Sequence, residues 1–426
     1  MTEYKLILEL ARHGARAPSE MYDFTTPEQD NFPAVMELTE LGVDQHYALG
    51  EYVRGKYFAD DPQLSSKTMK EALVYAQSTN KNRTLQSATS QLQGLWGTAT
   101  TWPALEPETY PVLTDVNQDK LILINSKNCE RFEQVEDDVA ASEEWKSLFE
   151  TKMGKDLLQP NVYDWLTEKT GEDLDLLKMS DVATYVHLAR YHGMELTFEV
   201  SEEHFKWCRA ASDQFTYEWF GATEELWQLA SRQQLKLLSE LVDVVFDGAT
   251  PAGDSVLSTN LYAPGLYSAG ELPYFWLLLG HQETLWPLSK ALGLEVAAKL
   301  PFASAYFFEF MTKDNKDYVN LVYRDDQGEV ENVQLGCSAS ATETACEKAA
   351  FKTFIGAAVT KAYEVDCDTD SPDTNLPYYD VEKFISELLE DLSLTDTRPK
   401  AKTDSTNRLQ TIQIATASLL AALSSE

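Results

Sequence analysis

Short apolar runs alternate with longer segments of helical periodicity along the first 120 residues. The runs 6–10 (LILEL) and 72–76 (ALVYA) predict two strands. A helix is expected over 37–57, where Thr39 is a plausible N-cap, and a second helix follows the run 72–76. The apolar residues that define one face of each helix are Leu49, Val53 and Tyr57 in the first, and Leu85, Ala88, Leu92 and Leu95 in the second. This βαβα order predicts a mainly parallel sheet covered by helices.

The pattern changes between about residues 130 and 247, where long helical windows rich in Leu, Trp, Glu and Lys leave little that reads as strand. Strand-like runs then return. The eight-residue apolar run 272–279 (LPYFWLLL) is typical of a buried central strand. Two runs on either side of 312–316 (TKDNK) predict an antiparallel hairpin near a sheet edge.

Together these patterns predict an α/β fold with a mainly parallel central sheet flanked by helices, a three-layer α/β/α arrangement, and an inserted, mostly helical subdomain. Residues 1–129 and 248–395 are expected to form the discontinuous α/β domain, with 130–247 as the helical subdomain. Residues 396–426 read as a polar linker and an apolar C-terminal segment. Its apolar part, 409–423, is too short and too rich in Gln and Thr to span a bilayer convincingly. A docked or amphipathic helix is favoured there over the remnant of a membrane or lipid anchor.

Charge narrows the range of partners. The chain of 426 residues has 35 Lys+Arg against 69 Asp+Glu, a formal net charge of −34. Such a chain repels nucleic acid except at a local basic patch, so we expect no nucleic-acid partner. Any cluster of arginines is therefore conspicuous.

The five cysteines form no C-x-x-C pair of the kind that binds zinc or carries redox chemistry. Cys337 and Cys346 are close enough in sequence to close a small loop, although spacing alone leaves this open. No apolar region precedes the first predicted strand, so the sequence favours either a cytosolic protein or one whose leader has been removed.

The first predicted strand runs into RHGARAP, residues 12–18. Arg12 and Arg16 bracket His13, and the planar guanidinium group is suited to phosphate because it offers paired donors and stays charged. A neutral imidazole can attack phosphorus and form a phosphohistidine. The alternative is a surface loop whose arginines pair with some of the many carboxylates.

Two other predicted strands are also followed by cationic or titratable side chains. Arg83 follows the run 72–76 at the start of a helix, where the backbone also favours an anion. His281, Gln282 and Glu283 follow the run 272–279. Ligands bind at the carboxyl ends of strands in such sheets, so the agreement of three loops favours a site over a surface loop. His281 is then a candidate donor to a phosphoryl oxygen, and Glu283 a candidate acid for the leaving alcohol.

At these residues a resemblance becomes visible. RHGARAP resembles the R-H-G-x-R-x-P signature of the histidine acid phosphatases, branch two of the histidine phosphatase superfamily. Residues 38–57 are similar to the helix after that signature, and 78–88 (STNKNRTLQSA) to the family's second phosphate-binding segment. Counterparts of CERF at Cys129 and GC at Cys337 extend the resemblance over most of residues 1–370, most weakly through the helical region.

The resemblance implies the roles in the site. His13 would be the nucleophile, Arg12, Arg16 and Arg83 would bind the phosphate of small phosphorylated substrates, and His281 would complete the pocket. The family uses no metal and no cofactor. The sequence agrees, because its six histidines lack zinc-ligand spacing; His187 and His192, five residues apart on an expected helix, would not share a face.

The resemblance also implies disulfides that join Cys129 to Cys367 and Cys337 to Cys346, with Cys208 free. Disulfides favour a lysosomal, vacuolar or secreted setting, with a cytosolic protein as the alternative. Family members often form homodimers. Membrane association is expected only through the C-terminal segment.

One position departs from the acid phosphatase pattern. The family usually has an aspartate as proton donor directly after the second histidine, whereas here Gln282 stands there, and an amide cannot supply the proton. Glu283 comes one residue later, an arrangement similar to the H-A-E version in multiple inositol polyphosphate phosphatases. We therefore assign Glu283 as the acid of an acid phosphatase. Two alternatives remain: a phytase-like inositol polyphosphate phosphatase, and a phosphate-ester binding protein with weak or no turnover.

Overall fold

Among the residues that the computed structural model describes, seven strands form one mixed sheet at the centre. The structure describes residues 2–25, 32–59, 74–96, 112–114, 121–123, 129–142, 159–171, 174, 176–205, 208, 223–251, 253, 255–259, 272–294, 300–340, 342–365 and 367. The strands are β1 (Thr2–Arg12), β2 (Val74–Ser78), β3 (Phe275–Gly280), β4 (Ala305–Lys313), β5 (Lys316–Arg324), β6 (Val330–Val333) and β7 (Cys346–Glu347). Their order is β2-β3-β1-β4-β5-β6, with β7 paired to β5.

The three strands that precede the candidate loops lie side by side and run parallel. β3 is central among them, with β1 on one side and β2 on the other. Arg12 pairs with Gly280 and Ser78 with Leu279, so all three strands end at the same edge of the sheet. The predicted α/β fold with parallel core strands is confirmed, and the sheet continues from β1 in antiparallel order through β4 and β5. These two strands form the predicted hairpin.

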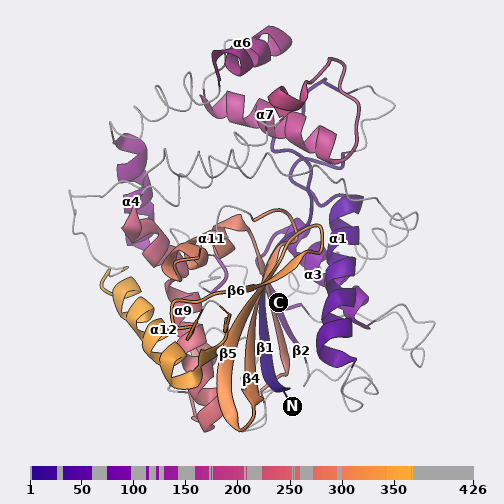
Figure 1. Ribbon diagram of the computed structural model, residues 1–426. Coiled ribbons are helices and arrows are strands. Elements are labelled where there is room, and N and C mark those ends of the chain that lie inside the picture. The colour runs from indigo at the N-terminus through magenta and orange to yellow at the C-terminus, as the bar shows by residue number, and fades with distance from the viewer. Residues whose placement is uncertain are drawn as a thin grey trace, which may run out of the picture.

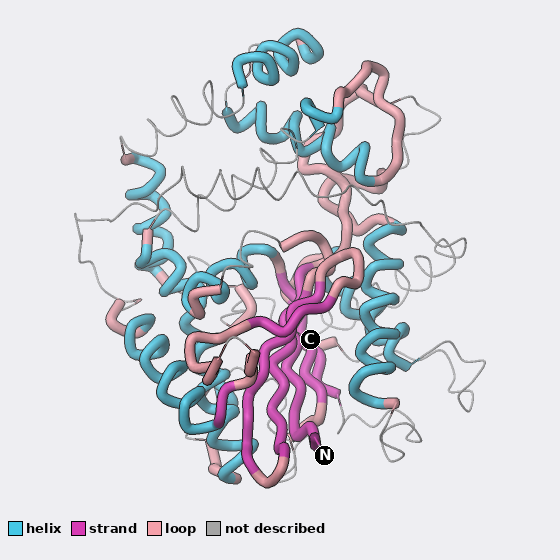
Figure 2. The backbone as a smooth tube through the Cα atoms, in the orientation of Figure 1, coloured by secondary structure: helices cyan, strands magenta, loops and turns pink. Residues whose placement is uncertain are grey.

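Helices cover both faces of the sheet (Figure 1). One face carries α1 (Glu40–Val53), the π-helical turn η1 (Arg54–Phe58) and α3 (Asn82–Trp96). The other face carries α9 (Glu224–Asp247), α11 (Gln282–Ala291) and α12 (Lys348–Ala362), with α4 (Glu130–Ala141) packed against α9. Figure 2 shows the strands enclosed between these two groups of helices, which is the three-layer arrangement expected from the sequence.

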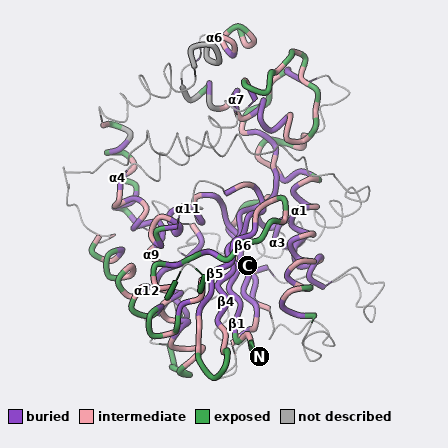
Figure 3. The backbone as a smooth tube through the Cα atoms, viewed as in Figure 1, coloured by how far each residue is buried: buried purple, intermediate pink, exposed green. Residues whose placement is uncertain are grey.

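Successive side chains of β1 point to opposite faces of the sheet, and apolar residues on both sides explain why helices can cover both faces. Leu6, Leu8 and Leu10 join the core with α9 and α11, whereas Ile7 and Ala11 join the core with α1 and α3. Figure 3 shows the middle of the sheet buried, whereas β6 and the first residues of β1 and β5 are more exposed. Glu9 shares the side of Ile7 and Ala11, so a carboxyl group lies inside the layer between the sheet and helices α1 and α3.

The two predicted N-terminal helices form as their patterns indicate. Thr39 caps α1 by accepting from the backbone N–H of Gly42, and the predicted apolar faces of α1 and α3 are buried. These helices pack closely: a Cβ on Gly50 would lie 2.0 Å from the carbonyl oxygen of Gln91. The close approach brings polar side chains of α1 and α3 together behind the end of β1.

The helices α6 (Gln159–Thr170) and α7 (Leu176–Tyr191) lie beyond the carboxyl edge of the sheet (Figure 1). They have a core of their own, to which Phe24 contributes from the segment after β1. The short helix α10 (Val256–Thr259) packs near α9, and α9 itself, within the range 130–247, packs against α11 and α12. The domain boundaries stay a prediction.

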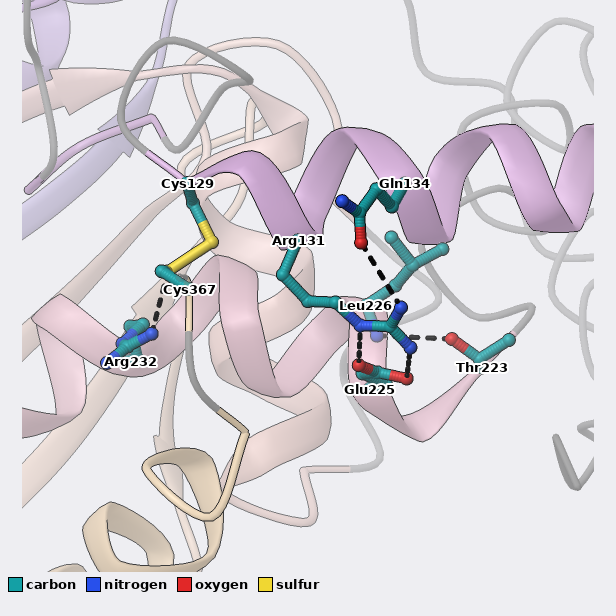
Figure 4. A network of polar contacts seen from close by, with 8 residues as sticks. All are labelled: Cys129, Arg131, Gln134, Thr223, Glu225, Leu226, Arg232 and Cys367. Atoms are coloured by element: carbon teal, nitrogen blue, oxygen red, sulfur yellow. Dashed lines mark hydrogen bonds and ion pairs between the residues drawn. A yellow bond between two sulfur atoms is a disulfide. The ribbon is translucent and has the colours of Figure 1, made fainter. Parts of the chain in front are cut away.

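Both disulfides implied by the resemblance are present, Cys129–Cys367 and Cys337–Cys346, and Cys208 is free and buried. The first bridge ties the start of α4 to the segment after α12, beside the ion pair of Arg131 with Glu225 (Figure 4). None of the helices in the described part of the chain is long and apolar enough to cross a membrane. The segment 409–423 lies outside the described residues.

Candidate active site

Three loops meet at the carboxyl edge of the parallel strands and are joined by backbone hydrogen bonds. The N–H of His13 donates to the carbonyl of Gly280 (3.0 Å), and the N–H of Thr79 donates to the carbonyl of Leu279 (3.2 Å). The candidate residues of the sequence therefore come together at one edge, from segments far apart along the chain.

His13 presents one ring nitrogen for chemistry. Its Nδ1 lies 2.8 Å from the carbonyl oxygen of Gly14, which can only accept, so Nδ1 holds the proton and Nε2 holds the lone pair. Burial lowers the pKa of His13 well below its ordinary value, and the neighbouring His281 and Arg83 lower it further. Both effects favour the neutral imidazole, which is the form that a nucleophile needs.

A close backbone approach fixes the loop after His13. A Cβ on Gly14 would come 2.4 Å from the carbonyl oxygen of Gly42, so only glycine fits there. The N–H of Gly14 donates to the hydroxyl of Ser87 (3.1 Å), and the N–H of Ala15 donates to the amide oxygen of Gln45 (2.8 Å). Sequence reasoning missed Ser87 and Gln45; their only signal was a polar side chain on the inner face of a helix.

Arg12 is buried at the end of β1. Its guanidinium group lies 4.3 Å from the ring centroid of Phe302 and donates to the carbonyl of Leu300. Its Nε is buried with no hydrogen-bond partner among the described residues. Neither the ring of Phe302 nor the single carbonyl neutralises the guanidinium group, so its positive charge remains available for an anionic ligand.

Arg16 and Arg83 add two more guanidinium groups. Burial, followed by the charges of Arg83 and Arg12, lowers the pKa of Arg16 to about 10, so it stays cationic at any acidic or neutral pH. Burial also lowers the pKa of Arg83, whose Nε has no hydrogen-bond partner within the described ranges. Three cations that raise one another's energy make a candidate site for an anion.

His281 lies opposite His13, the candidate nucleophile, with 5.4 Å between the two ring centroids. Its backbone N–H donates to the hydroxyl of Thr284, which fixes the start of α11. Its Nε2 lies 2.8 Å from the hydroxyl oxygen of Thr79, a contact that the sequence did not predict. Burial and the charge of Arg83 lower the pKa of His281 well below its ordinary value.

Gln282 and Glu283 are the first two residues of α11. Gln282 is buried, whereas Glu283 is partly exposed and interacts electrostatically with both Arg83 and Arg16. Of the two side chains only Glu283 has a proton to give, and it lies on the arginine side of the site.

A family model agrees with this geometry. The model of the histidine phosphatase superfamily (branch 2) matches residues 5–324. The chain belongs to this family. The family and the enzyme class predicted from RHGARAP, a histidine phosphatase, are confirmed.

Curated relatives are acid phosphatases. Human prostatic acid phosphatase is 24% identical over 383 residues, which cover 86% of this chain and 88% of the relative. Bovine lysosomal acid phosphatase is 24% identical over 329 residues, covering 76% of this chain and 71% of the relative.

Solved structures share the fold of this histidine phosphatase. The apo phytase of Hafnia alvei superimposes with a TM-score of 0.57 at 15% identity, over 85% of this chain and 98% of its own. The multiple inositol polyphosphate phosphatase of Bifidobacterium longum, in complex with inositol hexasulfate, gives a TM-score of 0.56 at 13% identity, over 84% and 93%.

Proposed function

We propose that this protein is an acid phosphatase that hydrolyses phosphate monoesters through a phosphohistidine on His13. The observation that carries the proposal is the arrangement of that ring: it is buried within a cluster of three arginines, and its Nδ1 faces the Gly14 carbonyl, which leaves the lone pair on Nε2. The acid phosphatases among the curated relatives support the same activity.

The first step transfers the phosphoryl group to the enzyme. Arg12, Arg16 and Arg83 bind the non-bridging oxygens, and Nε2 of His13 forms a bond to phosphorus as the ester P–O bond breaks. The departing alcohol oxygen takes the proton of Glu283. The electron pair of the broken bond leaves with that oxygen, so no cofactor is needed.

The second step releases phosphate. Glu283, now a carboxylate, takes a proton from water as the water oxygen bonds to phosphorus. The N–P bond breaks, its electron pair returns to Nε2, and inorganic phosphate leaves. Glu283 must be protonated for the first step, and an acidic medium supplies that proton.

Hydrolysis of p-nitrophenyl phosphate between pH 4 and 6 tests the proposal. We expect His13→Ala to abolish turnover, whereas His204→Ala, which removes a histidine stacked on Trp165 in the helical region, leaves it unchanged. Equal activity of His13→Ala and the parent protein would reject the proposed enzymatic activity and favour the alternative of a phosphate-ester binding protein.

The proton donor needs a separate test. On a substrate with a poor leaving group, such as an alkyl phosphate, Glu283→Gln should lose turnover about a hundredfold or more. Gln282→Glu is the matched control, since it adds a carboxyl one residue away and leaves Glu283 in place. Normal turnover by Glu283→Gln would reject this assignment.

A phytase-like activity is the second candidate, because phytases are among the similar solved structures. Charge argues against it: Glu37 and Glu283 interact with Arg83, and Asp181 with Arg16. Together with the net charge of −34, these carboxylates repel a substrate that carries many phosphates. We therefore expect a substrate panel to rank simple phosphomonoesters above phytate; the reverse ranking would favour the phytase.

The same reasoning suggests the setting and partners. Two disulfides favour a lysosomal, vacuolar or secreted protein. We also propose that the protein forms a homodimer and that it associates with membranes through residues 409–423. The proposal further includes the division into an α/β domain and a helical subdomain at 130–247. Sedimentation and vesicle binding, with and without 396–426, test the first two.

A further inference from the structure

A chain of buried polar side chains lies behind the loop that carries His13. The amide nitrogen of Gln91 lies 2.7 Å from both carboxyl oxygens of Glu9. The amide oxygen of Gln91 lies 3.1 Å from Nδ1 of His46, and Nε2 of His46 lies 3.0 Å from the carbonyl oxygen of Arg12. All three side chains are at most 1% exposed. The chain thus connects β1, α3 and α1 to the peptide between Arg12 and His13.

That peptide is held from both sides. Its carbonyl, from Arg12, accepts from His46, and its N–H, from His13, donates to the carbonyl of Gly280. The peptide links a candidate phosphate ligand to the candidate nucleophile. Its orientation therefore sets the relative position of the two groups.

Donors and acceptors restrict the protonation of the chain. The carbonyl of Arg12 only accepts, so Nε2 of His46 must carry a proton. If His46 is neutral, its Nδ1 needs a donor, which is the NH₂ end of the Gln91 amide; the two ends of an amide have the same shape. The oxygen of Gln91 then faces Glu9, and Glu9 must carry a hydroxyl proton. In the other possible arrangement Glu9 is a carboxylate and His46 is an imidazolium, so two charged groups lie in the core.

Burial selects between these arrangements, because both charged forms lose solvation in the core. Burial raises the pKa of Glu9 to about 8 and lowers the pKa of His46 to about 4. The hydrogen bond of Gln91 and the charge of Arg324 in β5 lower the pKa of Glu9, but less than burial raises it. The hydrogen bonds of Gln91 and of the Arg12 carbonyl raise the pKa of His46, but less than burial, with a smaller contribution from Arg324, lowers it. Between about pH 4 and 8 every member of the chain is therefore uncharged.

We propose that protonated Glu9 is a positioning residue for the phosphatase reaction, which through Gln91 and His46 holds the Arg12–His13 peptide in its active orientation. The inference rests on the proposed role of His13. When Glu9 loses its proton, the carboxylate requires the NH₂ end of Gln91, and the amide oxygen turns toward Nδ1 of His46. A neutral His46 has one N–H and can then serve either Gln91 or the Arg12 carbonyl. Loss of the proton thus loosens the loop and confines full function to acidic and neutral pH.

Two variants test the role of the hydrogen-bonded side chains Glu9, Gln91 and His46. The measured quantity is the affinity for sulfate, an anion that does not titrate between pH 5 and 9. Gln91→Met breaks the chain while keeping its shape, and we expect sulfate to bind about tenfold more weakly at pH 6. Glu9→Gln mimics the protonated carboxyl. It should bind sulfate as the parent does at pH 6 and about tenfold more tightly than the parent at pH 9.

The matched control is Glu309→Gln, a second buried carboxyl on the same face of the sheet, bonded to Lys56, Tyr57 and Asn320. It should follow the parent at both pH values. Parent-like binding by Gln91→Met would reject the positioning role. Identical pH dependence of Glu9→Gln and the parent would reject the role of the proton.

The ring of His46 supplies a readout that needs no turnover. In NMR spectra of protein with isotope-labelled histidine, the ring-nitrogen resonances of His46 should shift with a midpoint near pH 8 in the parent. In Glu9→Gln the same resonances should stay constant up to pH 9. A pH-independent His46 in the parent would overturn the proposal. If instead His13→Ala kept full activity, the proposed function would fail while this titration could still be read.

Discussion

The buried carboxyl of Glu9 makes stability depend on pH with a sign opposite to that of most carboxylates. Its pKa rises to about 8 in the folded protein, whereas glutamate titrates near 4.3 in an unfolded chain. Between these values the folded state binds one more proton than the unfolded state. The stabilisation is complete below the unfolded pKa and is lost as pH rises through the folded pKa, by about 1.4 kcal/mol per pH unit.

The difference between the parent and Glu9→Gln from pH 6.5 to 8 isolates this effect. Buried histidines have the reverse dependence: the lowered pKa values of His13, His46, His192 and His281 reduce stability as pH falls toward and below about 6.5, and both proteins share this loss. Over about 1.5 pH units, Glu9 should therefore cost the parent on the order of 2 kcal/mol that Glu9→Gln does not lose.

Urea unfolding with intact disulfides, at half-unit steps from pH 6.5 to 8, measures the difference. We expect the free energy of unfolding of Glu9→Gln to rise relative to the parent by about 2 kcal/mol across this interval. Glu309→Gln keeps Glu9 and should keep the slope of the parent. Parallel slopes for Glu9→Gln and the parent would refute the reasoning, because they would mean that Glu9 is ionised in the folded protein at pH 6.5.

Other contacts of the site give further predictions. Ser87→Ala removes the acceptor of the Gly14 N–H and should lower kcat/KM about tenfold, as expected for about 1.4 kcal/mol; an unchanged value would deny its support of the loop. Thr79→Val removes the partner of His281 Nε2 and should lower kcat more than it raises KM, which steady-state kinetics would contradict if only KM moved. Arg83→Gln should weaken sulfate binding at least tenfold by calorimetry, and parent-like affinity would remove Arg83 from the anion site. Replacing both Cys129 and Cys367 by serine should cost about 2–4 kcal/mol of stability, seen as a lower Tm, and an unchanged Tm would contradict a constraint from that bridge.

The positions of the principal candidates followed from the sequence because each depends on a local pattern. An apolar run that ends in a polar loop predicts a strand end, and parallel strands place their carboxyl ends together. Arg12, Arg83 and His281 meet near one edge for this reason. The partner of Cys129, 238 residues away, came only from the family resemblance, whereas spacing raised the Cys337–Cys346 pair without deciding it.

The supporting residues could not be predicted in the same way. Ser87, Gln45 and Thr79 are ordinary polar residues in the sequence, and their roles depend on which backbone group lies opposite them. Helix packing decides that, and a close approach such as that of Gly50 to α3 has no signature in the periodicity.

Glu9 best separates what the sequence determined from what the tertiary structure decided. The run LILEL determined a strand, and the loop after it determined where chemistry would lie. Nothing in that run indicates whether its one carboxyl faces water or the core. Only the packing of α1 and α3 on that face of β1 buries Glu9 and sets Gln91 and His46 beside it. Because the charge state of a carboxyl depends on its solvation and partners, the protonation of Glu9 is a property of the folded protein alone.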